Sequence, residues 1–377
     1  MTELYLIRHV QAEGNRYRMM QGRWDGDVTA LGYRQIEALT ACFRERRIDA
    51  VYSSDMFRAE VTARGIIKAH ENLSIQYDDR LREIDVGPWT TAFFGDLLHE
   101  KREDAEHFMY ESDKWFVDGA ETFEETGKRA LAALEEIARV NEGKTVAVVS
   151  HGVTIRCMLW KITGIAINDT AALPICRNAA FSRVIYENGC FRVKEINNTD
   201  HLQDQPQYHW DHTPVLRAES FNPSADTSFY TDCYSDAWRC AHGTLSGFAP
   251  MTYLACARKH YAADSRALLR AFEDDESAGL LDLDPVKGIN SGYGWISLLY
   301  LKDKYRHCGC GIQLLGRAVI YYQAKGRRAL RLSVAENNKD ALSFYLKWGF
   351  REVSSSEASG GRLIEMEKKI REKRILR

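Results

Sequence analysis

The sequence of 377 residues has no apolar run that approaches the roughly 20 residues a membrane-spanning helix needs. It also has no excess of charge of either sign, since its formal net charge is −2 at pH 7. Proteins that bind nucleic acids or anionic membrane surfaces by electrostatics normally show a basic excess. We therefore expect no nucleic-acid partner and no membrane partner. No charged leader with an apolar stretch opens the sequence, which favours a cytoplasmic protein.

The nine cysteines lack both the even count and the spacing of a disulfide framework. Cys308 and Cys310 are separated by one residue, whereas zinc knuckles and redox motifs use two. His209 and His212 flank Asp211, but further clustered ligands do not accompany them. We therefore predict a reducing environment and no metal.

The length favours two domains. A hairpin is predicted on either side of Asn188-Gly189, and a polar stretch follows it and runs to Pro206. We place a first domain at residues 1–203, a linker at 204–212 and a second domain at 213–377. The first domain alternates short buried strands with amphipathic helices, which predicts an α/β fold with a parallel sheet.

Three apolar strands of the first domain end in residues that suit phosphate chemistry. The strands and these residues are 4–7 with Arg8 and His9, 50–54 with Arg58, and 144–149 with His151. The carboxyl ends of parallel strands meet at one edge of a sheet, where α/β folds bind their ligands. Arginine fixes phosphate oxygens, and an imidazole can attack phosphorus. The pattern predicts a phosphate site at this edge.

Glu83 lies in a loop-like stretch between apolar neighbours, which suits a proton donor. Residues 92–118 are rich in aromatic and charged side chains without a clean period, as in a lid over a site. Structural explanations remain open for each residue alone. Arg58 can be a solvated helix arginine, and Glu83 can pair with Arg80 or Arg82.

Four motifs in order resemble the histidine phosphatase (phosphoglycerate-mutase-like) superfamily over about residues 1–200. They are Arg8-His9-Val10, Ser53-Ser54-Asp55-x-x-Arg58-Ala59, Leu81-x-Glu83-x-x-x-Gly87-x-Trp89 and Ser150-His151-Gly152. The resemblance implies a three-layer α/β/α fold that acts on a small-molecule phosphomonoester without a metal. It implies His9 as the nucleophile and Glu83 as the acid for the leaving group. It further implies that Arg8, Arg58 and His151 form an electrostatic cradle, with Asn15 as an added phosphate contact.

The sequence departs from that family pattern at two places. Val10 stands where glycine is usual, and Thr90-Thr91 stand where Glu-Gly is frequent. Neither change removes a catalytic group, so we keep the activity but expect no close equivalence to the glycolytic mutases.

A second phosphate motif lies in the second domain. An apolar strand at 294–301 leads to Arg306-x-x-Gly309-x-Gly311 and then to a helix. Backbone N–H groups at a helix start attract an anion, and glycines let it approach closely. A P-loop is excluded because no Gly-Lys-Ser/Thr follows.

Together with Asn338-x-x-Ala341-x-x-x-Tyr345-x-x-x-Gly349-Phe350, this motif resembles the GNAT family of N-acetyltransferases over about residues 213–370. The resemblance implies an α+β fold with a mixed, mostly antiparallel sheet, and acetyl-CoA as co-substrate for a small-molecule amine. It implies Asn338 near the cofactor and Tyr345 as the acid for the leaving thiolate. Its pyrophosphate loop would comprise Arg306, His307, Cys308, Gly309, Cys310 and Gly311.

Structural explanations remain open in this domain too. Asn338 can serve as a helix cap, and Tyr345 can be a packed core residue. No acidic residue within 295–301 presents itself as a general base.

The combination favours a bifunctional enzyme, a phosphatase fused to an acetyltransferase. A phosphomutase is an alternative, and so is a regulatory protein that senses phosphate or acetyl-CoA through an inactive phosphatase half. The sequence names neither substrate. We expect the basic carboxyl-terminal residues to be a solvated end; they are Lys368, Lys369, Arg371, Lys373, Arg374 and Arg377.

Overall fold

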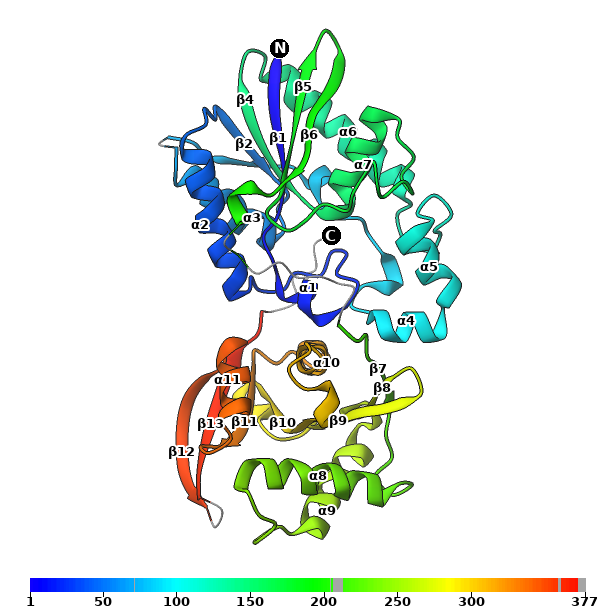
Figure 1. The fold of residues 1–377 in the computed structure, drawn as a ribbon, viewed down its shortest axis with the longest axis vertical. Coiled ribbons are helices and arrows are strands. Elements are labelled where there is room, and N and C mark those ends of the chain that lie inside the picture. Colours follow the sequence, from blue (N-terminus) through cyan, green and yellow to red (C-terminus); the bar gives the residue numbers. More distant parts are fainter. Residues whose placement is uncertain (71, 204, 206–212, 359–360, 372–377) are drawn as a thin grey trace.

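A computed structural model describes the chain apart from residues 71, 204, 206–212, 359–360 and 372–377 (Figure 1). Two separate mixed sheets organise it. The triplet around Asp211 and nearly all of the predicted linker lie outside the described residues. Within the described part, no helix is long and apolar enough to cross a membrane, and no cluster of three metal-ligating side chains forms.

The first sheet has the strand order β3-β2-β4-β1-β5-β6. Its strands are β1 Thr2–Arg8, β2 Ala50–Ser53, β3 Ile75–Tyr77, β4 Thr145–Ser150, β5 Phe181–Glu187 and β6 Cys190–Asn198. The first four strands pair in parallel, while β5 and β6 form the predicted antiparallel hairpin. The ends of β1, β2 and β4 therefore meet at one edge, as predicted.

Helices cover both faces of this sheet, which confirms the three-layer arrangement (Figure 1). Successive side chains of β1 point to opposite faces. The helices are α1 Glu13–Tyr17, α2 Ala30–Arg44, α3 Phe57–Ile67, α4 Phe94–Glu100, α5 Arg102–Tyr110, α6 Phe123–Val140 and α7 Gly152–Thr163. Leu4 and Leu6 pack with the layer of α6 and α7, whereas Tyr5 and Ile7 pack with that of α2 and α3.

The second sheet has the order β12-β13-β11-β10-β9-β8-β7. Its strands are β7 Arg217–Ser220, β8 Leu268–Glu273, β9 Glu276–Asp284, β10 Tyr293–Leu301, β11 Ala329–Ala335, β12 Arg351–Ala358 and β13 Gly361–Lys369. Its helices are α8 Thr227–His242, α9 Pro250–Ala263, α10 Gly311–Ala324 and α11 Lys339–Lys347. Only β10 and β11 pair in parallel among the described strands, so the sheet is mostly antiparallel, as predicted.

The two sheets are joined through α1, which packs on α10 (Figure 1). One apolar cluster contains Tyr17 and Trp24 from the first half together with Leu315 and Val319 of α10. The basic end of the chain takes part in this junction, so the prediction of a solvated end was wrong for two of its residues. Lys368 is buried and its Nζ lies 2.6 Å from Oε1 of Glu13, and Nε of Arg371 donates to Oδ1 of Asp27 at 2.7 Å.

Candidate active sites

The first candidate site lies where β1 and β4 end side by side. Arg8 is in register with Ser150, so His9 and His151 follow at adjacent strand ends. Their ring centroids are 5.1 Å apart. Arg58 reaches the same place from the first turn of α3. The structure thus brings four of the predicted residues together.

His9 is buried and held in one orientation. Its Nδ1 lies 2.7 Å from the carbonyl oxygen of Val10, which can only accept, so the proton is on Nδ1 and Nε2 carries the lone pair. Burial, together with Arg58 and Arg8, lowers the pKa of His9 well below its usual value. The imidazole is therefore neutral at pH 7, and its nucleophilic nitrogen is Nε2.

Arg58 and His151 lie beside His9. Arg58 donates from Nε to Nε2 of His9 at 3.3 Å and from Nη1 and Nη2 to the carbonyls of Trp24 and Gly22 at 2.8 and 3.0 Å. Burial is the main cause that lowers the pKa of His151 well below its usual value. Both side chains are thus fixed beside the nucleophile, Arg58 as a cation and His151 uncharged.

Glu83 faces the start of α7. Its Oε1 accepts hydrogen bonds from the backbone N–H and the hydroxyl of Thr154, each at 3.1 Å. Its Oε2 lies 3.4 Å from the N–H of Val153. These donors fix the carboxylate opposite Arg8, whose guanidinium packs against Gly152. A Cβ at Gly152 would lie 3.1 Å from Cζ of Arg8, a tight contact that would require the guanidinium to shift by a few tenths of an ångström.

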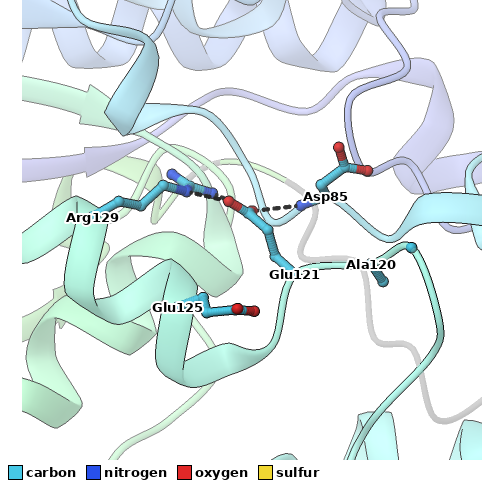
Figure 2. Close-up of a pocket in the computed structure, with 6 residues that line it drawn as sticks. Asp85, Ala120, Glu121, Glu125 and Arg129 are labelled. Carbon is cyan, nitrogen blue, oxygen red and sulfur yellow. Dashed lines mark hydrogen bonds and ion pairs between the residues drawn. The ribbon is translucent and has the colours of Figure 1, made fainter.

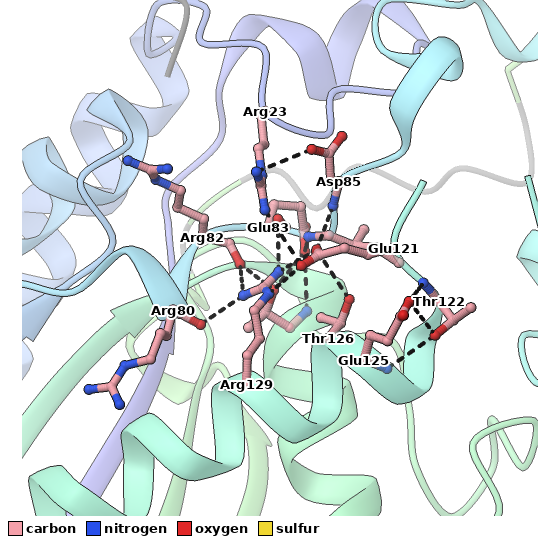
Figure 3. A network of polar contacts seen from close by, with 12 residues as sticks. Arg23, Arg80, Arg82, Glu83, Asp85, Glu121, Thr122, Glu125, Thr126 and Arg129 are labelled. Carbon is pink, nitrogen blue, oxygen red and sulfur yellow. Dashed lines mark hydrogen bonds and ion pairs between the residues drawn. The ribbon is translucent and has the colours of Figure 1, made fainter. Parts of the chain in front are cut away.

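Arg129 of α6 holds the loop that carries Glu83 (Figure 3). It donates to the carbonyl oxygens of Arg80, Arg82 and Glu83 at 2.7, 2.9 and 3.1 Å. It also pairs with both carboxylate oxygens of Glu121 at 2.7 and 2.8 Å. The structural explanation for Glu83 does not apply, since Arg80 pairs with Asp78 and Arg82 pairs with Asp55.

A hollow of about 430 Å³ lies beside this network (Figure 2). Asp85, Glu121, Glu125 and Arg129 line it. Glu121 is turned to Arg129 and accepts the N–H of Asp85 at 2.9 Å. Glu121 and Arg129 therefore support the Glu83 loop from this hollow.

A larger cavity of about 790 Å³ opens in front of the buried histidines. Arg8, Asn15 and Glu83 line it, whereas His9, Arg58 and His151 lie behind its wall. Residues 92–118, predicted to be a lid, contain α4 and α5, and Phe94, Leu98 and Phe108 from these helices line the cavity.

Two lining residues were missed from the sequence. Nδ2 of Asn178 donates to the carbonyl oxygen of His9 at 3.1 Å. Arg156 of α7 is buried and also lines the cavity. A charged residue between the apolar Ile155 and Cys157 was the available signal for Arg156, whereas Asn178 sits in a loop without a motif.

The second candidate site is the loop before α10. Gly309 has φ +89° and Cys310 is right-handed with φ −75°, an alternation that turns successive N–H groups toward one side. The side chain of Arg306 is used elsewhere, since it donates to the carbonyl of Leu301 at 2.8 Å and to Asp236 at 2.9 Å. Cys308 and Cys310 have their sulfurs 3.5 Å apart, and His307 is exposed.

The strands β10 and β11 pair only from Tyr293 with Ala329 to Trp295 with Arg331 in the described structure. Beyond that point the two strands are not paired with each other in the described structure. Asn338 caps α11 by accepting the N–H of Ala341 at 3.2 Å. Tyr345 is buried between Phe344 and Phe350, and burial raises its pKa, so its hydroxyl keeps its proton.

Comparisons with known proteins match a segment of each half of the chain to a family. Residues 4–199 match the histidine phosphatase superfamily (branch 1), and residues 228–350 match the acetyltransferase (GNAT) family. Phosphoserine phosphatase 1 of Hydrogenobacter thermophilus is 30% identical over 202 residues, which are 54% of this chain and 95% of that protein. Probable phosphoglycerate mutase GpmB of Yersinia enterocolitica is 29% identical over 211 residues, 55% of this chain and 97% of that protein.

Among solved structures, Bacillus stearothermophilus YhfR matches with a TM-score of 0.52 and 26% identity. The match covers 54% of this chain and all of that one.

Proposed function

The chain belongs to the histidine phosphatase superfamily, and on that premise we propose that residues 1–203 hydrolyse small phosphomonoesters through a phosphohistidine on His9. The observation that carries this proposal is the neutral, oriented imidazole of His9 beside the buried Arg58 and the cavity-lining Arg8. Phosphoryl transfer needs little more than an aligned nucleophile and fixed positive charge.

The reaction has two steps. Nε2 of His9 attacks phosphorus and the ester P–O bond breaks, while Glu83 gives a proton to the departing alkoxide. The carboxylate of Glu83 then takes a proton from water, whose oxygen attacks phosphorus, and the P–N bond breaks to release phosphate. Arg8, Arg58 and His151 stabilise the equatorial oxygens, and Asn15 is an added contact.

Hydrolysis of an aryl phosphate in the presence of EDTA tests this proposal, with His9→Ala as the inactive variant. Loss of turnover in the variant supports the phosphohistidine route. Phosphoserine and phosphoglycerate are the first metabolites to assay, because relatives of this half carry those names. A phosphohistidine that survives in water and passes to a second acceptor would favour the mutase instead, and phosphate binding without hydrolysis would favour the sensor.

The chain also carries a GNAT domain, and we propose that residues 213–377, after a linker at 204–212, transfer an acetyl group from acetyl-CoA to a small-molecule amine. The pyrophosphate would lie on the amides of residues 306–311, near Asn338. The protonated hydroxyl of Tyr345 would protonate the coenzyme A thiolate as it leaves. Calorimetric binding of acetyl-CoA, then thiol release with a panel of amines, tests the proposal. Binding without release on any amine would favour an acetyl-CoA sensor.

A further inference from the structure

Arg156 is a buried arginine with no carboxylate partner among the described residues. Its side chain is 6% exposed, and Ile155 and Cys157 beside it in α7 are fully buried. Its Nη2 donates to the carbonyl oxygen of Ile167, and its Nε has no hydrogen-bond partner. Burial lowers its pKa, the neighbouring Cys157 opposes that effect only in part, and no carboxylate contributes.

An unpaired buried cation costs several kcal/mol of folding free energy. An anionic ligand beside such a group would offset this cost. Arg156 lines the 790 Å³ cavity in front of His9, so an anion in that cavity can reach it.

The position of Arg156 on α7 relates it to the phosphate site. Residues 152 and 156 are one turn apart on the same face of the helix, about 6 Å along its axis. Arg8 packs against Gly152, and both arginines line the cavity. A substrate that binds its phosphate at Arg8 can therefore reach Arg156 with a group that lies a few bonds from the phosphate.

We propose that Arg156 binds a carboxylate of the substrate, so that the phosphatase half selects phosphomonoesters that carry a carboxylate a few bonds from the phosphate. This rests on the proposed phosphatase function. A carboxylate matches the single charge of one guanidinium and its planar fork, whereas a second phosphate would leave a surplus negative charge. Apolar Leu98, Phe123 and Val153 line the same cavity and suit the carbon chain between the two anions.

Two substrate pairs that differ at the carboxylate test the proposal. They are O-phosphoserine with O-phosphoethanolamine, and 3-phosphoglycerate with glycerol 3-phosphate. We expect the protein to prefer the carboxylate in at least one pair, and Arg156→Gln to reduce the ratio of kcat/KM within that pair roughly 10- to 100-fold. A ratio does not depend on the fraction of folded protein. Arg156→Lys keeps the charge without the fork and should restore part of the ratio.

Arg177, an exposed arginine at the rim of the same cavity, provides the comparison. The proposal is overturned if Arg177→Gln changes the ratio of kcat/KM within the pair as much as Arg156→Gln does. The absence of any carboxylate preference also overturns the proposal. So does a preference for fructose 1,6-bisphosphate, which carries a second phosphate, if it exceeds the preference for the carboxylate substrates and Arg156→Gln removes it. Calorimetric binding of the same pairs to His9→Ala keeps the two proposals apart. A carboxylate preference in binding, without hydrolysis by the unaltered protein, would refute the phosphatase and leave the subsite standing.

Discussion

A single substitution tests the proposed role of Glu83 most directly. Glu83→Gln keeps the shape and loses the transferable proton, so we expect turnover to fall roughly 10²- to 10⁴-fold. An aryl phosphate with a good leaving group needs less help in the first step, so a burst of phenol should precede the slow release of phosphate. Rapid-mixing kinetics measure both phases.

Glu125→Gln is the matched control for that substitution. Glu125 is a nearby exposed carboxylate that caps α6 through Thr122 and does not line the large cavity. The Glu125→Gln variant should keep the turnover of the unaltered protein. Near wild-type turnover in Glu83→Gln would contradict the assignment of Glu83.

The residues of the phosphate site could be predicted because each follows a strand end or opens a helix. Arg8, His9 and His151 needed only the knowledge that parallel strands end at one edge. Arg129 could not be predicted, because the loop carbonyl groups that it holds lie 46 to 49 residues away. Arg156 left one signal, a charge between apolar neighbours, but nothing in the local sequence shows the cavity that it lines. Local sequence carries no record of such contacts.

At the scale of elements, α6 positions the Glu83 loop through one side chain. We expect Arg129→Gln to lower the free energy of unfolding by about 2 kcal/mol, since hydrogen bonds to a charged group are lost. We also expect kcat to fall more than KM rises, because the loop that holds Glu83 loses its three carbonyl contacts. Urea unfolding and steady-state kinetics measure the two effects.

Arg139→Gln on the same helix is the control, since its Nε makes one exposed bond of 3.4 Å to the carbonyl of Glu135. Equal kcat values in the two variants would show that Arg129 does not position Glu83.

The helices α8 and α9 are tied to β9 by a buried polar chain. Nδ1 of His260 lies 2.7 Å from Oδ1 of Asp282, and the hydroxyl of Tyr230 donates to Oδ2 at 3.0 Å. Burial acts to lower the pKa of His260, but Asp282 and Asp284 outweigh it and raise that pKa. The stabilisation is therefore complete below about pH 6.5, the pKa of a free histidine, and is lost as the pH rises through the folded value.

We accordingly expect the difference in unfolding free energy between the unaltered protein and His260→Asn to shrink as the pH is raised from 6 to 9. The matched control for the substitution itself is His99→Asn, which changes an exposed histidine of α4 in the same way. A difference that grows with pH would contradict the raised pKa.

At the scale of the whole molecule, the two halves share an apolar cluster and a buried ion pair. Removal of one partner of a buried pair leaves the other charge without compensation. We expect Lys368→Met to destabilise the protein by about 3 to 5 kcal/mol, and both activities to be lost at the same denaturant concentration. The double variant with Glu13→Gln should recover part of the loss.

Lys369→Met changes the next residue, which is exposed, and should leave stability nearly unchanged. Equal stabilities of the two lysine variants would show that the junction contributes little.

The α/β fold of the first half could be predicted because its strands and helices follow local apolar periods, whereas the mostly antiparallel sheet of the second half was implied by the family resemblance. The junction between the two halves could not be predicted from the sequence. Lys368 alternates with apolar Ile364 and Met366 on the buried side of β13, yet its charge suggested solvent. Only the partner Glu13, 355 residues earlier, makes that burial tolerable.

The most direct test of the account is the site of phosphorylation during turnover. After rapid mixing with substrate and an alkaline quench, trypsin releases residues 9–16, which contain a single histidine, His9. The account predicts that this peptide gains the mass of one phosphoryl group, and that the gain is absent from the same segment in His9→Ala. Turnover with the phosphoryl group on another residue would contradict the account. So would turnover without any covalent phosphoryl group in Glu83→Gln, the variant in which phosphate release should be slow.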